Sequence, residues 1–380
     1  MPPVRWLHLG FALTGVGTTL LGCILPTLST IWHMDDSRAG ILFAAQFSGS
    51  ALGALLVRND FFGSLRHGYF LLIASAVSLS LFTGVLQVAL FLGFGLGLGL
   101  TMTATSMLIC SIASGKRGAA LALLNASWAA GAVLCPGIAS LWIRRWSPIY
   151  LFPILAAAFA ATALLVGQHR AAFSAADSHP ATTEGKPRQF MLLFIFATLA
   201  FLYVGIEVSV SGWMMTYVHR MRISSILWPP IATSGFWIAL LGGRVLAPAV
   251  LRRLSEGQLF TCSLTIAFSS TVLLLLSHSA MAIVLFAAVA GLTLGPIYPL
   301  CLARVLSITN DSPKAKWVFA ISGLGGAIFP WMTGQISAYS GSLRAGLVVP
   351  VFALGAMIIL HRLELTGHFR SVGTKQATVG

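Results

Sequence analysis

One carboxylate in the middle of a long apolar stretch is the first candidate for chemistry. Glu207 carries the only charge between Phe190 and Val218. An acidic side chain at the centre of a membrane-spanning helix costs about 2.5–3.5 kcal/mol to insert, so such residues are usually retained for function. The competing interpretation is a Glu207 that only ties neighbouring helices together through hydrogen bonds. We favour a functional role.

Spacing places Glu207 on a helix face with other chemically useful side chains. Tyr203, Glu207, Ser211 and Met214 follow one another at intervals of four, four and three residues and therefore share one face. Three roles remain open for the carboxylate: hydrogen bonding to substrate hydroxyls, uptake of a proton or help in binding sodium, and pairing with another helix. We expect direct substrate contact, with ion coupling as a second role of the same residue.

Few other hydrogen-bonding side chains are expected at mid-membrane depth. Gln46 and Asn125 each carry an amide that both donates and accepts, which suits a polyhydroxylated substrate. A hydrogen bond between helices explains them equally well. Gln335, near the end of its span, is a weaker candidate for the same role.

Aromatic side chains extend the candidate site. The apolar face of a sugar ring packs on indole, whose N–H can donate to a hydroxyl. Trp128 follows Asn125 by three residues and shares its face, while Tyr298 lies between Pro296 and Pro299 in what should be a kinked helix. The indoles expected deep in the membrane are those of Trp128, Trp213, Trp237 and Trp331.

Composition identifies the class of protein. Of the 380 residues 57% are hydrophobic and 8% are charged, and the mean hydropathy is +0.89. Soluble domains carry about 25% charged residues, so an all-α polytopic membrane protein is predicted. The net charge of +14 comes from short basic clusters between apolar runs, which indicates membrane topology rather than nucleic-acid binding. The five cysteines lack metal-site spacing, and no nucleophile–base set is evident, so we expect no cofactor and no enzyme activity.

Twelve spans can be drawn, each long enough to cross a hydrocarbon core of about 30 Å. One long polar connection separates six spans from six, which predicts an N-terminal bundle (1–167), a flexible linker (168–188), a C-terminal bundle (189–362) and a tail (363–380). The predicted spans are Trp6–Trp32, Ser37–Arg58, Leu65–Leu86, Val88–Ile112, Lys116–Trp142, Pro148–Val166, Gln189–Val218, Ser224–Leu251, Gly257–Ser277, Ala280–Ser307, Lys314–Ala338 and Leu343–His361.

Basic residues predict the orientation. With the N-terminus in the cytoplasm, seventeen of the Lys and Arg residues fall on the cytoplasmic side and six on the other. Cytoplasmic loops carry the excess of basic residues, so both termini are expected inside, in a cell (inner) membrane.

The two halves repeat with an offset of 194 residues. This shift lays the stretch Gly131–Pro136 over Gly325–Pro330 and Arg58 over Arg252. It also makes Leu13 the counterpart of Glu207, so the carboxylate has no acidic partner in the first half. The repeat therefore predicts two pseudo-symmetric six-helix bundles.

Six plus six spans, parallel halves and a central linker resemble the major facilitator transporters. Within that superfamily, the motif Phe-Leu-Tyr-Val-Gly-x-Glu-Val over 201–208 looks like the seventh helix of the fucose:proton symporter and sodium–glucose carrier group. The stretches Gly325–Pro330 and Gly295–Pro299 are similar to its eleventh and tenth helices. The resemblance implies a substrate site between the halves and alternating access to the two sides of the membrane.

Two departures from that family bear on mechanism. The loop after the second span keeps only fragments of the superfamily motif, around Gly53, Arg58 and Asp60. The first and fourth spans contain no carboxylate, whereas proton-coupled fucose carriers have them there; the fourth offers threonines, which we interpret as packing residues. We therefore expect facilitated diffusion or coupling through Glu207.

No cation is expected deep in the bundle. Arg244 and Arg304 lie near the inner ends of their spans, where lipid phosphates, helix ends or gate groups would contact them. The alternating glycines from Gly93 to Gly99, with Gly291 and Gly295, predict close helix packing and bending of cavity helices.

These features predict a monomeric transporter in the bilayer that moves a neutral sugar or sugar-like polyol by alternating access. It would act either as a symporter, with a proton or a sodium ion as the coupled ion, or as a facilitator. The alternatives are an efflux carrier for amphipathic compounds, which would use the aromatic residues as an apolar wall, and a membrane receptor that does not transport.

Overall fold

The computed structural model describes residues 4–113, 117–171, 173, 188–221, 225–301, 304 and 315–365, and this part of the chain is helical without strands. It contains twelve helices of 15 residues or more, one for each predicted span, which confirms the all-α prediction. A 3₁₀ turn (Pro148–Tyr150) precedes α6 and a short α14 (Leu343–Gly346) precedes α15. The long helices are α1 (Val4–Ile31), α2 (Asp36–Leu56), α3 (Phe61–Leu81), α4 (Leu86–Ile112), α5 (Arg117–Ile143), α6 (Leu151–Gly167), α8 (Arg188–Arg220), α9 (Trp228–Val250), α10 (Glu256–Leu276), α11 (Ala280–Leu294), α13 (Ala315–Ser340) and α15 (Val348–Leu365).

Ten of the described helices are long and apolar enough to cross a membrane, and α3 and α13 are not among these ten. Helix α3 carries Arg66 and His67 in its first turns. Helix α13 packs against α2 and α8 inside the bundle, where its surface faces other helices and need not be as apolar as a lipid-facing one.

The tenth predicted span is interrupted. Helix α11 ends at Leu294, a turn follows at Gly295 and Pro296, and the chain is helical again from 297 to 301. Proline has no N–H to donate to the preceding turn, so the helix breaks there. The remainder of that predicted span lies largely outside the described residues.

The predicted linker and tail also fall mostly outside the described part of the chain. Helix α6 ends at Gly167 and α8 begins at Arg188, which agrees with the predicted ends of the connection. Residues 172 and 174–187 and those beyond 365 are not described, so the linker and the division into domains stay predictions.

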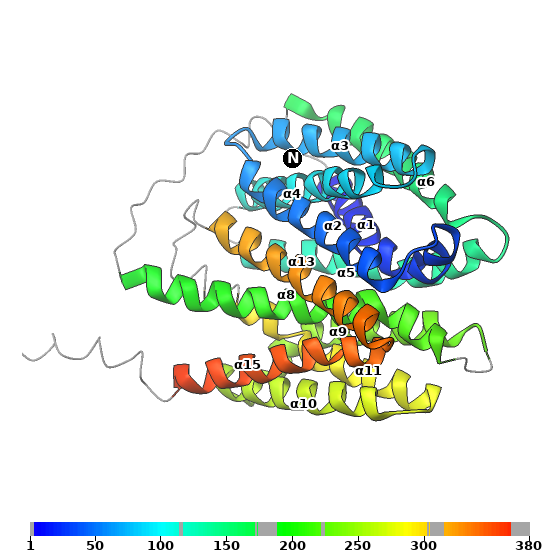
Figure 1. Ribbon diagram of the computed structural model, residues 1–380. Helices are drawn as coiled ribbons and strands as arrows, with labels where there is room; N and C mark the ends of the chain where they lie inside the picture. The colour runs from blue at the N-terminus through cyan, green and yellow to red at the C-terminus, as the bar shows by residue number, and fades with distance from the viewer. Residues whose placement is uncertain are drawn as a thin grey trace, which may run out of the picture.

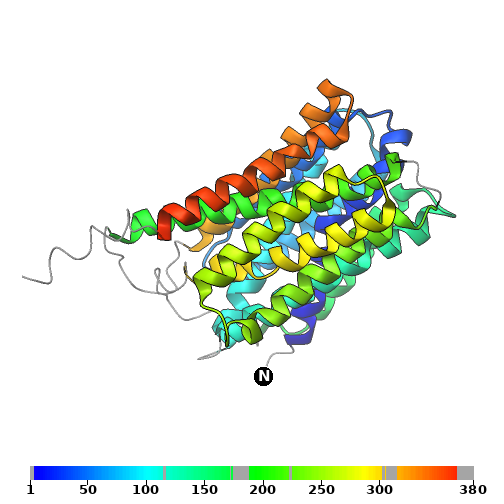
Figure 2. The same cartoon turned by 90° about the horizontal axis from the view of Figure 1, so that it is seen from below.

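The first six helices and the later ones lie side by side as two groups (Figure 1). Helices α3, α4 and α6 lie along one flank, and α10 and α15 lie along the other. Between the groups, α2 packs against α13, α1 against α8 and α5 against α9. Figure 2 shows the second group from below, with α8 and α15 running next to each other. The contacts between the groups therefore come from six helices, and these helices also surround the cavity described below.

Glycines set the spacing between α2 and α4. A Cβ atom added at Gly95 or Gly99 would collide with the backbone carbonyl oxygens of Gln46 or Ser50 on α2. The predicted close packing at these glycines is thus seen, and it brings the α2 residues Gln46 and Ser50 to the level of the cavity. Small residues allow such backbone contact between membrane helices.

Two glycines related by the 194-residue repeat pack their helices against the first helix of their own half, although their contact partners are not themselves related by the offset. A Cβ atom at Gly131 would collide with the carbonyl oxygen of Ala12 on α1, and one at Gly325 with that of Phe201 on α8. The pairs α1–α5 and α8–α13 therefore pack through the same small residue in the two halves.

We predict that Gly95→Ala destabilises the protein because the added methyl group meets backbone rather than a movable side chain. Overpacking of this kind costs about 1–3 kcal/mol. Gly137→Ala in α5 is the matched control, since a Cβ atom there meets nothing within 4 Å. Thermal unfolding in detergent should show a lower Tm for Gly95→Ala only; equal Tm values for the two variants would contradict the packing argument.

Candidate functional site

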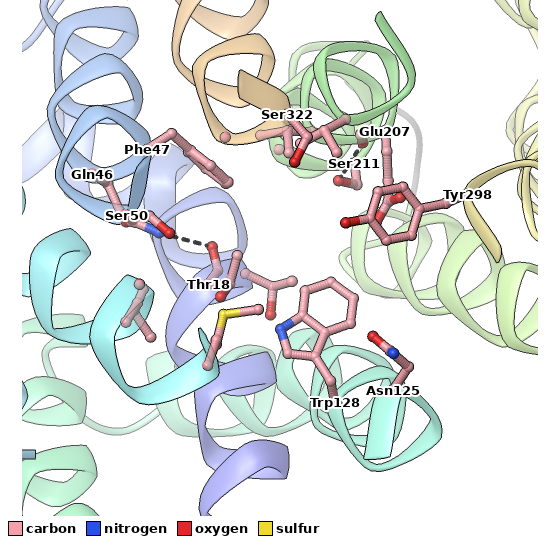
Figure 3. Close-up of a pocket in the computed structure, with 18 of the residues that line it drawn as sticks. Thr18, Gln46, Phe47, Ser50, Asn125, Trp128, Glu207, Ser211, Tyr298 and Ser322 are labelled. Atoms are coloured by element: carbon pink, nitrogen blue, oxygen red, sulfur yellow. Dashed lines mark hydrogen bonds between the residues drawn. The ribbon is translucent and has the colours of Figure 1, made fainter. Parts of the chain in front are cut away.

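A cavity of about 180 Å³ lies between the two groups of helices, lined from both sides (Figure 3). The structure brings seven of the ten predicted site residues to its wall. These are Gln46, Asn125, Trp128, Tyr203, Glu207, Trp237 and Tyr298.

Glu207 is paired with a cation, contrary to the expectation that the cavity holds none. An Oε atom of Glu207 lies 3.6 Å from a guanidinium nitrogen of Arg244, and both side chains are buried, with 8% and 12% of their surface exposed. Arg244 also donates to the Tyr203 hydroxyl at 3.4 Å. The predictions that no cation lies deep in the bundle and that Arg244 serves the inner end of its helix are therefore wrong, whereas pairing with another helix was one of the three roles left open for Glu207.

The physical reason is the reach of the arginine side chain. Arg244 lies in the last third of α9, which packs against α8. Its long, flexible stem lets the guanidinium reach Glu207 and Tyr203 of α8 at the wall of the cavity. Position along the sequence showed where the backbone lies but not which way this long side chain extends.

The first half supplies amides and an indole rather than charges. Gln46 donates to the backbone oxygen of Thr18 on α1 at 3.1 Å, which is the expected hydrogen bond between helices. Its own Oε1 atom is buried and has no partner among the described residues. Asn125 donates to Leu121 of its own helix at 2.9 Å. The indole N–H of Trp128 is buried and equally without a described partner.

Aromatic pairs form two parts of the wall. The rings of Trp128 on α5 and Trp237 on α9 meet edge to face at 5.4 Å and thus join the two halves. Tyr203 and Tyr298 stack at 5.4 Å beside Glu207. Figure 3 shows Trp128 and Glu207 on different helices around the same cavity, so a ligand there would contact both apolar and polar groups.

Three predicted residues lie elsewhere. Trp213 is fully buried and donates through its indole nitrogen to the backbone oxygen of Pro330 at 3.1 Å, so it ties α8 to α13. Trp331 is 40% exposed on α13. Gln335 accepts a hydrogen bond from the Ser37 hydroxyl at 3.0 Å. Met214, expected on the face of Glu207, is buried but absent from the cavity wall.

Apart from Ser211, which was expected on the face of Glu207, small hydroxyl side chains were missed as cavity residues. The sequence signal that could have identified them is weak. It consists of Ser and Thr residues near the middle of predicted spans, at helical spacing, in the helices that pack between the two groups. The described wall includes the hydroxyl residues Thr18, Thr19, Ser50, Thr103, Ser106, Ser211, Thr233 and Ser322. Thr103 was interpreted as a packing residue.

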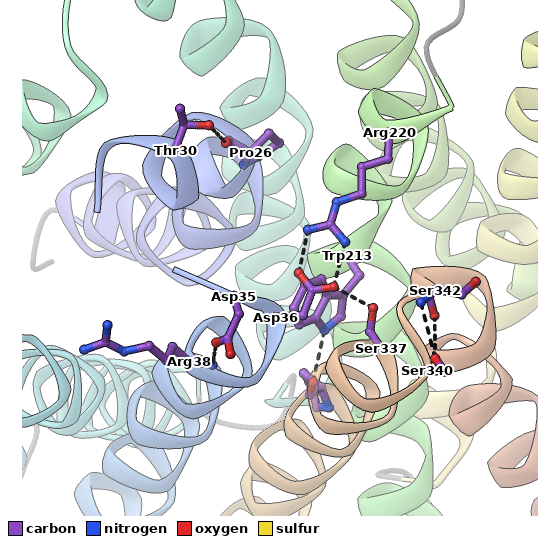
Figure 4. A network of polar contacts seen from close by, with 11 residues as sticks. Pro26, Thr30, Asp35, Asp36, Arg38, Trp213, Arg220, Ser337, Ser340 and Ser342 are labelled. Atoms are coloured by element: carbon purple, nitrogen blue, oxygen red, sulfur yellow. Dashed lines mark hydrogen bonds and ion pairs between the residues drawn. The ribbon is translucent and has the colours of Figure 1, made fainter. Parts of the chain in front are cut away.

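The two groups are joined by polar contacts at one end of the bundle, which we call the Asp36 end (Figure 4). Asp36 at the start of α2 accepts two hydrogen bonds from the guanidinium of Arg220, the last residue of α8, and one from Ser337 of α13. Ser37 and Gln335 add a contact next to it. Among described residues, the hydrogen bonds between the halves gather toward this end, except the one that the Ser234 hydroxyl donates to the backbone oxygen of Val133.

Comparison with known proteins identifies the family. The family model described as Major Facilitator Superfamily matches residues 7–316. The chain belongs to this superfamily. With the helical architecture it is a multi-pass membrane transporter rather than an enzyme.

Relatives within the superfamily include sugar transporters. The chain is 23% identical to the yeast (Saccharomyces cerevisiae) Bypass of stop codon protein 6, over 90% of the chain and 79% of that protein. It is 28% identical to a glucose/mannose transporter of Bacillus subtilis, over 50% of each. A glucose/galactose transporter of Brucella abortus is 24% identical over 44% of the chain and 41% of its own length. The chain thus spans half or less of these two bacterial relatives.

Solved structures share the fold. The xylose transporter of E. coli, in a partially occluded inward-open conformation, superposes with a TM-score of 0.75 at 15% identity over 96% of each chain. A peptide transporter gives the same TM-score at 13% identity, over 97% of this chain and 94% of the other. Because a sugar and a peptide transporter fit equally well, this similarity defines the fold and leaves the substrate to the residues of the cavity.

We predict that Glu207 and Arg244 are energetically coupled. Removing one charge leaves the other buried without compensation, whereas removing both does not. The single variants Glu207→Gln and Arg244→Gln should each lower the thermal stability, and the double variant should lose less than their sum, by about 0.5–3 kcal/mol. Thermal unfolding of the four proteins in detergent measures this; strictly additive losses would contradict a direct pairing.

Proposed function

We propose that this transporter carries a neutral sugar or sugar-like polyol between the two sides of a cell's inner membrane by alternating access. The observation that carries the proposal is a cavity of balanced charge whose wall presents both donors and acceptors. Glu207 and Arg244 are the two charged side chains among the described cavity residues, and their charges cancel.

The hydrogen-bonding groups of the wall match a polyol. Gln46 offers an acceptor, and the indole N–H of Trp128 and the Nε–H of Arg244 offer donors; all three atoms are buried without a described partner. Sugar hydroxyls donate and accept, so one ring can satisfy groups of both kinds. The apolar face of the same ring fits the indole pair of Trp128 and Trp237.

Glu207 and Arg244 are proposed as direct substrate contacts. A carboxylate and a guanidinium form hydrogen bonds roughly twice as strong as neutral ones. A bound hydroxyl can accept from Arg244 and donate to Glu207 within the pair that is already present. The relatives named as glucose, mannose and galactose transporters support a monosaccharide as the class of substrate.

Ion coupling, where it exists, is proposed to run through Glu207. Helices α1 and α4 contain no acidic residue, so the positions used by related proton symporters are unavailable for proton binding. Counterflow compared with gradient-driven uptake separates facilitated diffusion from coupled transport.

The excess of basic residues on one side predicts the orientation of the protein, and the orientation in turn predicts which end forms the outer gate. With both termini in the cytoplasm, the Asp36 end faces outward. The contacts of Asp36 with Arg220 and Ser337 then act as an outer closure that has to break when the cavity opens to the outside. The similarity to a structure described as inward-open is consistent with this state.

We predict that Glu207→Gln lowers the uptake of a radiolabelled monosaccharide into proteoliposomes. Loss of a hydrogen bond to a charged group costs about 1.5–3 kcal/mol, so affinity should fall roughly tenfold or more. Glu256→Gln is the matched control, because Glu256 is exposed at the start of α10 and its nearest cation is Arg304. Unchanged counterflow, gradient-driven uptake and affinity in Glu207→Gln would remove this residue from the site, and absence of saturable uptake across a panel of monosaccharides would overturn the proposed substrate.

We predict that Asp36→Asn opens the Asp36 end more often. Because Arg220 is 45% exposed, its pair with Asp36 contributes about 1 kcal/mol, which corresponds to roughly a fivefold change in the open population. Alkylation of Cys23, which lines the cavity, by a membrane-impermeant maleimide reports opening and can be followed by mass spectrometry.

Asp35→Asn is the control for that measurement. Asp35 accepts from the backbone N–H of Arg38 as the N-cap of α2, a role that asparagine also fills. Faster labelling in Asp36→Asn than in Asp35→Asn is expected; equal rates in the two variants would contradict a closing role for Asp36.

An amphipathic drug is the competing substrate class, because part of the first-half wall is apolar, with Phe11, Phe47 and Met102 among its residues. Drug susceptibility of cells that express the protein tests it. Protection from several unrelated amphipathic compounds, without sugar uptake, would favour efflux.

A further inference from the structure

A second hollow lies outside the transport cavity, at the end of the bundle opposite Asp36. It has a volume of about 220 Å³ and lies between the start of α3 and the end of α6. Its wall combines two arginines with apolar side chains: Arg66 and Arg170 with Phe62, Leu65, Ala163 and Val166. We call it the α3–α6 groove.

The two guanidinium groups of the groove are available to an outside ligand. Arg66 and Arg170 are both exposed, and neither forms an ion pair with a carboxylate of the described residues. Asp60, the nearest described acid in the α3 sequence, is the N-cap of that helix and accepts from the backbone N–H of Gly63. His67 bonds to the backbone oxygen of Gly63 at 2.7 Å. The groove therefore presents positive charge to an anion.

Its position relates the groove to the membrane surface. Phe70, one helical turn from Arg66 on the same face of α3, is 68% exposed, and Leu164, near the end of α6 and six residues before Arg170, is 71% exposed. Large apolar side chains that are so exposed on a membrane protein face the acyl chains. The arginines thus lie where an apolar outer surface ends, which is the depth of lipid headgroups.

We propose that the α3–α6 groove binds the phosphate of one anionic phospholipid, with Arg66 and Arg170 as its ligands. Arginine matches phosphate geometry because its planar N–H groups form two parallel hydrogen bonds. Basic pockets between membrane helices are suited to such headgroups. The apolar wall receives the glycerol backbone, and the acyl chains run along Phe70 and Leu164. This site is separate from the sugar cavity and does not depend on the proposed substrate.

Native mass spectrometry of the detergent-solubilised protein, titrated with phosphatidylglycerol or phosphatidylcholine, tests the proposal. Each arginine near a membrane surface contributes about 1 kcal/mol to binding of anionic lipid, or roughly fivefold in affinity, so Arg66→Gln/Arg170→Gln should bind phosphatidylglycerol about 25-fold more weakly. The matched control is Arg252→Gln/Arg253→Gln, which removes two exposed arginines that follow α9 at the same end of the bundle.

A second variant leaves the charges in place. A Cβ atom at Gly167, which lines the groove, meets nothing within 4 Å, so Gly167→Leu fills the groove without a backbone clash. It should also weaken phosphatidylglycerol binding while phosphatidylcholine binding stays unchanged.

Three results would overturn the proposal. They are equal losses in the groove and control variants, full affinity in both groove variants, and protection from thermal unfolding by inorganic phosphate as strong as that by phosphatidylglycerol. The last would assign the groove to a free anion instead of a lipid.

Discussion

The compensation of charge inside an apolar bundle is the constraint on which the site depends. Hydrocarbon offers no hydrogen bonds, so a carboxylate on α8 needs a partner within the protein. Arg244 supplies it from α9 and also donates a hydrogen bond to the Tyr203 hydroxyl. The pair adds polarity to the cavity without adding net charge, and the proposed neutral substrate rests on this property.

The two halves contribute different chemistry to one cavity. Both described charges come from the second half, whereas the amides of Gln46 and Asn125 and the indole of Trp128 come from the first. A ligand between them would contact both halves and couple their relative movement to binding. The Asp36 contacts hold the same halves together at one end, so the occupant of the cavity and the closure act on the same interface.

Glycine-mediated packing connects the fold to the site. The backbone of α4 can approach α2 because Gly95 and Gly99 carry no side chain, and that approach places Gln46 and Ser50 beside the cavity. The internal repeat uses Gly131 and Gly325 in the same way in the two halves.

Composition and periodicity alone determined the membrane class and the twelve long helices, and they singled out Glu207 as a charge within an apolar run, because apolar runs and an isolated charge are local properties of the chain. The resemblance in the helix of Glu207 also indicated the superfamily. Tertiary structure decided the rest. Arg244 meets Glu207 because α9 packs against α8 and the arginine side chain is long enough to reach the carboxylate. Trp213 and Gln335 instead form hydrogen bonds with Pro330 and Ser37. Which way a side chain points, and which helix lies opposite, depend on packing between segments far apart in sequence, and no spacing within one span contains that information.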